Sequence, residues 1–313
     1  VAYSQGLLSN LIKLMNKVRI NACPLCGSTN INHFKNCTDF YASSESFDLG
    51  RCEQCGFIFT HEFPDEKEIG RYYEAPDYIS HTDTRKGFMN RIYHYVRSYM
   101  LSKKAQLVMK ESHRRSGRIL DIGTGTGYFA NAMYLRGWQV EAVEKSPSAR
   151  SFAKEHFNLD VKSEEALLDF PDASFDVITL WHVMEHLQNL QNTWERLSDL
   201  LSERGILVVA VPNCDSYDAK KYGEHWAAYD VPRHLWHFTP ATMQQWGAKN
   251  GFILAARHPM PFDAFYVSML SEKNKGNSMP FVRGLLTGTM AWFSSLAKKE
   301  RSSSMIYIFR KKR

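Results

Sequence analysis

Three glycines at alternate positions follow an apolar run and a single acid in the segment RILDIGTGTGYF, which occupies residues 118–129. This order of residue types predicts a buried strand, a tight turn and a helix N-terminus. Glycine permits positive φ and lets a ligand approach the main chain closely, while the helix start offers unpaired N–H groups and a partial positive charge. The segment predicts a site for a nucleotide-like ligand formed by Asp121, Gly123, Gly125 and Gly127.

The spacing of these glycines distinguishes between kinds of nucleotide site. A dinucleotide fingerprint needs glycine or alanine three residues after Gly125, and that position is Tyr128. A P-loop needs Gly-Lys followed by Ser or Thr, which is absent from this turn. Neither a typical dinucleotide site nor a phosphate-binding P-loop is therefore expected.

Two Cys-x-x-Cys pairs, each followed by glycine, predict a metal site made by Cys23, Cys26, Cys52 and Cys55. Four thiolates in a tetrahedral arrangement suit Zn²⁺. Disulfides are the alternative, and His33 or Cys37 from the intervening segment could replace one ligand. Residues 21–62 are too few to bury a sufficient apolar core alone, so we expect a zinc ribbon whose folding depends on the metal.

Two histidine clusters could carry acid–base chemistry. The first is WHVMEHL at residues 181–187, directly after a predicted strand, with His182, Glu185 and His186 as catalytic candidates. It also matches the H-x-x-E-H pattern of inverted zinc proteases, or its residues could simply bond one another and cap the turn. The second lies in the aromatic loop 226–238, where Asp230, Arg233 and His234 are candidates for contacting a substrate. Arg233 would suit a carboxylate or phosphate.

Strands and helices alternate from residue 118 onward, which predicts an α/β fold with a largely parallel sheet and helices on both faces. Seven strands are expected, near residues 118–122, 139–144, 160–161, 174–180, 205–211, 252–257 and 305–310. Residues 261–303 interrupt this order with apolar blocks and predict a helical insert. Residues 63–117 predict a helical linker, with Tyr78 and His81 as candidates for a lid over the substrate.

The chain has 313 residues, 23% of them charged, and a net charge of +6. This mild charge does not by itself indicate nucleic acid, and the ribbon segment 30–51 carries only Lys35 and Arg51 as fixed positive charges. Residues 1–20 predict an amphipathic helix, with peripheral membrane contact as the alternative to packing on protein. No transmembrane segment or signal peptide is expected, so we expect a cytoplasmic protein; its oligomeric state is left open.

The pattern Asp-x-Gly-x-Gly-x-Gly at 121–127 resembles motif I of class I S-adenosylmethionine-dependent methyltransferases, and the likeness extends over about residues 118–260. It implies a Rossmann-like seven-stranded fold. It also implies that Glu144 binds the ribose hydroxyls, that Glu164 meets the adenine amino group, and that Trp181 adjoins the cofactor. Residues 175–187 resemble the branch with ubiquinone-biosynthesis O-methyltransferases, and the cysteine pairs resemble zinc-ribbon sugar C-methyltransferases.

Residues and resemblance together predict methyl transfer from S-adenosylmethionine to oxygen or carbon of a small-molecule or carrier-linked acceptor, such as a sugar or cell-surface precursor. A histidine near neutrality could remove a proton from the acceptor. The alternatives are a zinc-ribbon binding module, or a macromolecule methyltransferase in which the ribbon docks protein or nucleic acid.

Overall fold

The computed structural model describes residues 17–73 and 88–312, with the side chains of 88–96 left out. Tyr78, His81 and residues 1–16 of the predicted N-terminal helix lie outside the described residues. The end of that predicted helix is wrong: Lys17–Arg19 form strand β1, which pairs antiparallel with β5 (Glu62–Pro64). Val18, a β-branched residue between Lys17 and Arg19, suits this edge pairing as well as a helix.

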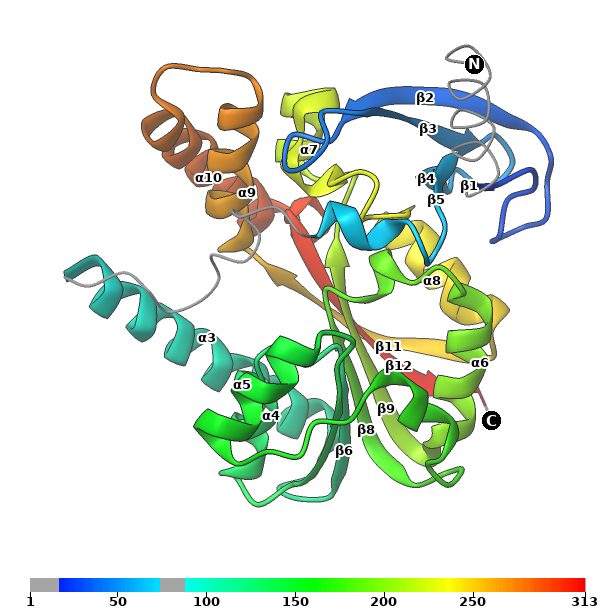
Figure 1. The fold of residues 1–313 in the computed structure, drawn as a ribbon, viewed down its shortest axis with the longest axis vertical. Coiled ribbons are helices and arrows are strands. Elements are labelled where there is room, and N and C mark those ends of the chain that lie inside the picture. Colours follow the sequence, from blue (N-terminus) through cyan, green and yellow to red (C-terminus); the bar gives the residue numbers. More distant parts are fainter. Residues whose placement is uncertain (1–16, 74–87, 313) are drawn as a thin grey trace, which may run out of the picture.

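A six-stranded sheet forms the centre of the molecule (Figure 1), in the order β11-β12-β9-β8-β6-β7. The strands are β6 (Arg118–Ile122), β7 (Gln139–Val143), β8 (Phe175–Trp181), β9 (Leu201–Pro212), β11 (Phe252–Met260) and β12 (Ser304–Lys311). The first four are mutually parallel, whereas β12 runs antiparallel to both neighbours. The predicted α/β class is confirmed. The predicted strand at 160–161 is reduced to one bridge between Val143 and Lys162.

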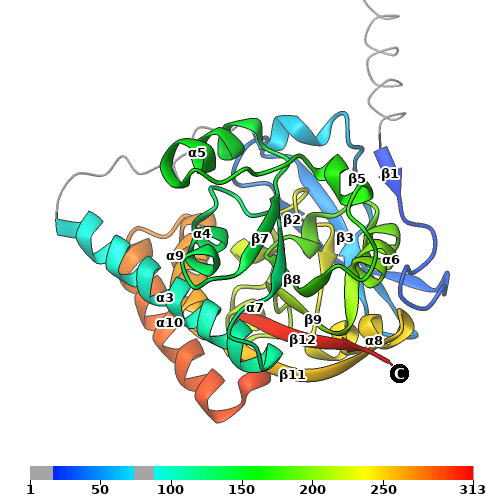
Figure 2. The ribbon, with the colours of Figure 1, turned by 90° about the horizontal axis from the view of Figure 1, so that it is seen from below.

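Helices cover both faces of this sheet (Figure 2). On one face, α3 (Phe88–Ser112) and α4 (Tyr128–Tyr134) bury Ala105, Val108 and Phe129 with the strands. On the other, α6 (Leu190–Leu200) and α8 (Pro240–Lys249) bury Trp194 and Trp246. Because Ala105 and Val108 of α3 are fully buried, this part of the predicted lid helix is a layer of the core.

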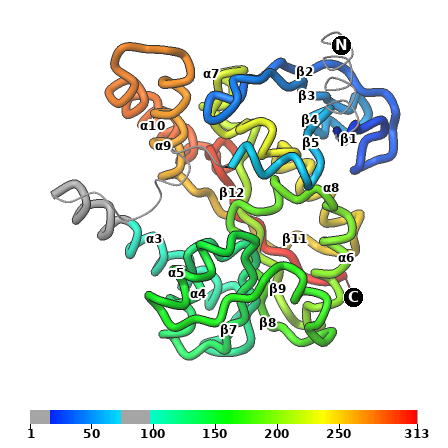
Figure 3. Tube along the Cα trace, viewed as in Figure 1, coloured from blue at the N-terminus to red at the C-terminus, as the bar shows by residue number. Residues whose placement is uncertain are grey.

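The cysteine-containing segment forms a small antiparallel sheet of β2 (Ile31–Thr38), β3 (Ser46–Cys52) and β4 (Ile58–Thr60). A fourth strand, β10 (Trp236–His237), comes from the loop after β9 and pairs with β4. Figure 3 shows these two distant segments side by side. The aromatic ring of Phe57 packs against Trp236, Phe238 and Trp246, so the ribbon and the large sheet share one core.

The remaining helices are α5 (Pro147–Phe157), α7 (Tyr217–Tyr222), α9 (Asp263–Asn274) and α10 (Pro280–Ala297). Short 3-10 helices occupy Ile69–Tyr72, Glu164–Leu168, Met184–His186, Gly223–His225, Ala227–Tyr229 and Lys299–Arg301. Helices α9 and α10 pack on each other as a hairpin at one side of the molecule (Figure 1). They lie within the segment 261–303. None of the described helices is long and apolar enough to span a membrane.

Candidate active site

The glycine turn joins β6 to α4 at the carboxyl end of the parallel strands, where ligands bind in open α/β sheets. Gly123, Gly125 and Gly127 have φ values of +63°, +56° and +83°, which residues other than glycine rarely adopt. A Cβ added at Gly123 would lie 2.5 Å from Val183, and one added at Gly127 would lie 2.9 Å from Ala153. A Cβ added at Gly125 would meet nothing within 4 Å. Two glycines therefore serve close packing, and the middle one faces open space.

Glu144 follows β7 and braces this turn. One carboxylate oxygen accepts a hydrogen bond from the backbone N–H of Gly125 at 2.8 Å, and the other accepts from Ser146 N–H at 2.9 Å. The side chain is only partly buried, so it borders the open space at Gly125. Glu164 lies exposed in the 3-10 helix after the bridge that follows β7. Both acids thus stand after the strand neighbouring β6.

Asp121 lies at the base of the turn and is 1% exposed. One of its oxygens accepts a hydrogen bond of 2.6 Å from the Thr179 hydroxyl on β8, while the other is buried without a hydrogen bond. Burial raises the pKa of this carboxyl to about 6. An unsatisfied buried carboxylate oxygen beside a glycine turn fits a ligand that supplies a cationic donor, such as an ammonium group.

Trp181 ends β8 and lies on the face of the sheet covered by α3 and α4. Its ring meets the edge of Phe129 with centroids 5.1 Å apart, and the Lys104 ammonium lies 4.4 Å from the Trp181 centroid. Burial lowers the pKa of Lys104. Trp181 therefore forms part of the wall between the turn and α3.

His182 occupies a left-handed backbone conformation with φ of +56° immediately after β8. Its Nδ1 lies 3.4 Å from Glu185, and its Nε2 lies 3.4 Å from Asp263 at the start of α9. Burial alone would lower the pKa of His182, but these two carboxylates outweigh it and raise the pKa to about 9. His182 is a cation at neutral pH, so in this arrangement it cannot act as a general base.

His186 and His234 lie side by side in the cluster, with ring centroids 4.5 Å apart. The Nδ1–H of His186 donates to the Arg233 carbonyl at 3.1 Å, and that of His234 donates to the Ala228 carbonyl at 2.9 Å. Because a carbonyl only accepts, these two contacts favour a proton on each Nδ1. Burial, and then the neighbouring His234, lowers the pKa of His186 to about 4.

Glu185 completes this cluster and is 1% exposed. Its carboxylate, His186 and His234 each place one ligand-capable atom within 4.8 Å of the others, a geometry that suits a proton relay or a metal ion. The inverted zinc-protease interpretation is wrong, because Met184–His186 form a single 3-10 turn and His182 stands outside it. The two histidines of that pattern do not share a helix face.

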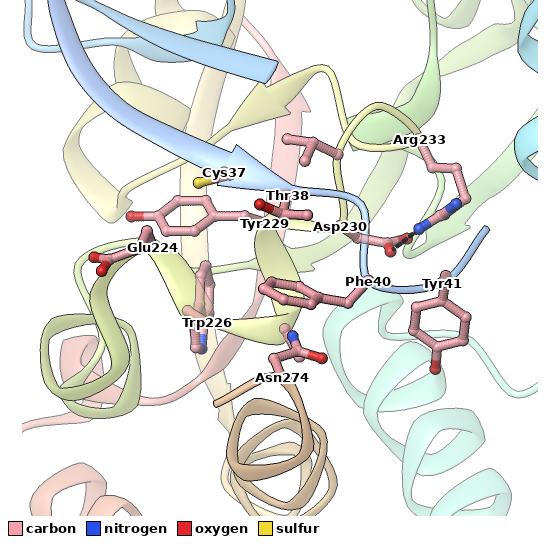
Figure 4. A pocket seen from close by; sticks show the side chains of 12 residues that line it. Cys37, Thr38, Phe40, Tyr41, Glu224, Trp226, Tyr229, Asp230, Arg233 and Asn274 are labelled. Atoms are coloured by element: carbon pink, nitrogen blue, oxygen red, sulfur yellow. Dashed lines mark hydrogen bonds and ion pairs between the residues drawn. The ribbon is translucent and has the colours of Figure 1, made fainter. Parts of the chain in front are cut away.

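Arg233 and Asp230 lie against the ribbon and form ion pairs and hydrogen bonds with other residues of the protein. The Arg233 guanidinium is 1% exposed and donates to Asp230 at 2.7 Å, to Asp39 at 2.9 Å and to the Tyr72 carbonyl at 2.8 Å. The crevice beside them (Figure 4) holds about 10 Å³, room for roughly one water. The expectation that Arg233 binds an anionic group of the acceptor is contradicted, because its charge is already compensated.

The four cysteines predicted as metal ligands lie together at one end of the ribbon. The Sγ atoms of Cys23 and Cys55 are 3.5 Å apart, those of Cys26 and Cys52 are 3.4 Å apart, and all four fall within 4.8 Å. None forms a disulfide. About 3.8 Å between sulfurs follows from tetrahedral Zn–S bonds of about 2.3 Å, so the donor set fits zinc. Cys37 is buried on β2 and outside this group.

Three contributors to the site were not singled out from the sequence. Asp263 pairs with His182 from the helical hairpin, Thr179 holds Asp121, and the Tyr73 hydroxyl lies 3.1 Å from His186 Nδ1. Thr179 could have been found, because it occupies the position on β8 directly opposite Asp121 on β6. Tyr73 and Asp263 come from distant segments and leave no local signal.

The chain is similar to known methyltransferases over its central part. A family model described as a methyltransferase domain matches residues 92–256, which is 165 of 313 residues. The mitochondrial ubiquinone biosynthesis O-methyltransferase of Schizosaccharomyces pombe is 28% identical over 39% of this chain and 47% of its own length. The corresponding Rhodopseudomonas palustris (strain HaA2) enzyme is 28% identical over 47% of this chain and 62% of its own length.

An uncharacterized methyltransferase of Bacillus mycoides is 30% identical over 44% of this chain and 69% of its own length. A putative sarcosine dimethylglycine methyltransferase from Galdieria sulphuraria has a similar structure, with a TM-score of 0.49, 15% identity, and coverage of 71% of this chain and 88% of that one. The chain spans about half the length of the first ubiquinone biosynthesis enzymes it matches. The class I resemblance read from the glycine turn is confirmed by the family match: the chain belongs to the methyltransferase domain family.

Proposed function

We propose that the chain transfers a methyl group from S-adenosylmethionine to oxygen or carbon of a small-molecule or carrier-linked acceptor. One observation carries the proposal: at the carboxyl ends of β6, β7 and β8, an open glycine turn stands with a buried unsatisfied acid and a pair of adjacent histidines. That edge of the sheet is where this class of fold binds ligands. The names of the ubiquinone biosynthesis relatives favour oxygen as the acceptor atom.

The donor would be held by the residues around the turn. Its amino group suits the unsatisfied oxygen of Asp121, and its ribose hydroxyls suit Glu144, which already borders the space at Gly125. Glu164 and Trp181 would flank the adenine and the methyl-bearing end. When bound, S-adenosylmethionine supplies a methyl carbon already activated by a sulfonium, so the protein chiefly needs to align the acceptor and exclude water.

His186 or His234 would accept the proton of the acceptor. The lowered pKa of His186 keeps its ring unprotonated at neutral pH, and the Arg233 carbonyl at its Nδ1 favours Nε2 as the proton acceptor. One of them takes the proton from an acceptor hydroxyl or acidic carbon while the new bond to the methyl carbon forms and the carbon–sulfur bond breaks. His182, held as a cation, would orient Glu185 and contribute positive charge to the site.

The four-cysteine cluster would hold a structural zinc, since four thiolates leave no open position for catalysis. The alternative, in which the ribbon docks a protein or nucleic acid, would place the acceptor site on the ribbon. Against it, Phe57 and Phe59 of the ribbon are fully buried in the shared core. A sugar or cell-surface precursor is the acceptor that the sequence resemblance suggests.

Calorimetry with S-adenosylmethionine tests the donor site. Wild-type protein should bind the donor, and Glu144→Gln should weaken binding by about tenfold, because the amide keeps the size but loses the charge. Glu155→Gln, an exposed change on α5, is the matched control and should bind as wild type does. Binding of NADH in place of S-adenosylmethionine would overturn the assignment.

A labelled-methyl screen over metabolite extracts tests the acceptor side. Wild-type protein should label an acceptor, whereas His186→Ala should retain donor binding and lose about two orders of magnitude in transfer rate. His33→Ala, a ribbon histidine with a 64% exposed side chain, is the control and should transfer normally. Normal transfer by His186→Ala and by His234→Ala would refute the proposed bases.

A further inference from the structure

The helical hairpin of α9 and α10 has its small residues inside and its large apolar residues outside. Gly284, Thr287, Gly288, Ala291 and Ser295 of α10 are buried. On the opposite side, seven side chains are 47% to 61% exposed, namely Phe281, Val282, Leu285, Leu286, Met290, Phe293 and Leu296. We call these seven the α10 outer face. A water-facing helix has the reverse distribution.

Close approach of the two helices explains which residues lie inside. An added Cβ at Gly284 would meet the Met269 backbone at 2.5 Å, and one at Gly288 would meet the Phe265 backbone at 2.8 Å. Two glycines four residues apart that bring helices into backbone contact form the small-xxx-small arrangement common between helices in lipid. Packing within the hairpin therefore needs none of the outer apolar residues, which stay available for another surface.

Basic residues surround this apolar face. Lys275, Arg283, Lys298, Lys299 and Arg301 are exposed on the hairpin and the turn after it. A groove of about 400 Å³ beside the hairpin is lined by Lys220, Lys221 and Arg301 together with Asp215 and Tyr217. The Tyr217 hydroxyl lies 3.5 Å from the Met290 sulfur, so the groove adjoins the α10 outer face directly.

The acids of the same segment are bonded within the chain. Asp263 faces His182, Glu272 accepts from the Tyr222 hydroxyl at 2.9 Å, and Glu300 lies 3.4 Å from Arg257. The hairpin thus presents an apolar surface with a positive rim. Apolar insertion with surrounding positive charge is complementary to an anionic lipid surface, in which acyl chains lie below phosphate groups.

We propose that the α10 outer face and its basic rim dock the protein on an anionic phospholipid bilayer. The proposal is independent of the methyltransferase activity, because the hairpin lies beyond the matched residues 92–256. The helix lies in the interface and does not cross it, in agreement with its one arginine and several polar residues.

Vesicle sedimentation tests the proposal with the full chain. Wild-type protein should pellet with vesicles of phosphatidylcholine containing about 30% phosphatidylglycerol, and not with pure phosphatidylcholine. Raising NaCl from about 0.05 M to about 0.5 M should reduce the bound fraction several-fold. Equal binding to neutral vesicles, or none to anionic ones, would overturn the proposal.

Matched variants separate the docking face from general surface effects. Leu286→Glu with Phe293→Glu should lower vesicle affinity by about tenfold or more. Leu135→Glu with Ile253→Glu, two apolar sites elsewhere that are 73% and 53% exposed, should leave affinity unchanged. Circular dichroism and thermal unfolding check that each variant is folded. Equal vesicle affinity of the two folded double variants would contradict the proposal.

Charge and self-association give two further readouts. Lys298→Glu with Lys299→Glu should lower affinity for anionic vesicles about tenfold, whereas Lys67→Glu with Lys154→Glu, also exposed, should change it little. Light scattering at several protein concentrations should show no dimer that depends on Leu286 and Phe293. Such a dimer would assign the face to a second copy of the chain and overturn the lipid assignment.

Discussion

His182 should make the stability of the protein depend on pH in a window where few other groups titrate. Its folded pKa of about 9 exceeds the 6.5 of an ordinary histidine because Asp263 and Glu185 hold the charged ring. This difference in pKa sets an upper limit of about 3 kcal/mol on the contribution of His182 to the free energy of unfolding. The side chain is 34% exposed, so solvent screening reduces the expected contribution to about 1–2 kcal/mol.

The sign follows from proton linkage. A folded-state pKa raised above the unfolded value means that the contribution is fully present below pH 6.5 and is lost as pH rises through about 9. Urea unfolding of wild type and His182→Asn at about pH 6 and about pH 9.5 should show a stability gap of about 1–2 kcal/mol at the lower pH that closes at the higher one. Asparagine tolerates the left-handed conformation, so backbone strain does not confound the comparison.

NMR titration measures the same quantity directly. The His182 ring signal, assigned by its loss in His182→Asn, should titrate near pH 9, and Asp263→Asn should bring it markedly closer to 6.5. A signal that already titrates near 6.5 in wild type, or a stability gap that does not change with pH, would refute the double ion pair. The same shift would follow if Glu185 alone held the ring, but Asp263→Asn would then have no effect.

Three other outcomes follow from the geometry. Gly125→Ala should lower the free energy of unfolding by about 1 kcal/mol because of its positive φ, and it should weaken donor binding. Gly123→Ala should lower the free energy of unfolding more, because the new Cβ would lie 2.5 Å from Val183. Urea unfolding measures the stabilities and calorimetry measures donor binding. Metal analysis should find about one zinc per chain, lost in Cys52→Ser with a lower melting temperature; a metal-free, fully stable wild type would contradict this. Arg233→Met should lower the free energy of unfolding by about 3–5 kcal/mol, because Asp39 and Asp230 lose their cationic partner. The folded variant should keep its affinity for the donor. A loss of donor affinity would show that Arg233 takes part in binding.

Local sequence patterns were sufficient to predict the features that depend only on residues close together in the chain. The glycine turn, the strand–helix alternation and the cysteine pairs each need only neighbouring residues, and the structure forms a turn of three positive-φ glycines and a four-cysteine cluster. The strand expected near residue 160 was overestimated, because an edge segment with one bridging residue, Lys162, is too short to make a ladder.

Long-range contacts were out of reach of the sequence. Arg233 looks like an anion-binding residue in its own loop, and only the fold brings Asp39 of the ribbon to its guanidinium. In the same way, His182 looks like a base until Asp263 arrives from the helical hairpin and keeps it protonated. In both cases a carboxylate from a distant part of the chain changes the role that the local sequence suggested.

The pairing of β10 with β4 makes the ribbon poorly suited to exchange as a cassette. The Thr60 hydroxyl donates to the His234 carbonyl at 2.9 Å, and the Thr60 N–H donates to the Leu235 carbonyl at 2.9 Å, so the ribbon backbone sets the position of a candidate base. A chimera with a foreign ribbon would misplace His234 unless residues 226–238 were transplanted with it. Recombination that separates the two segments should therefore yield a protein whose candidate site is not correctly formed.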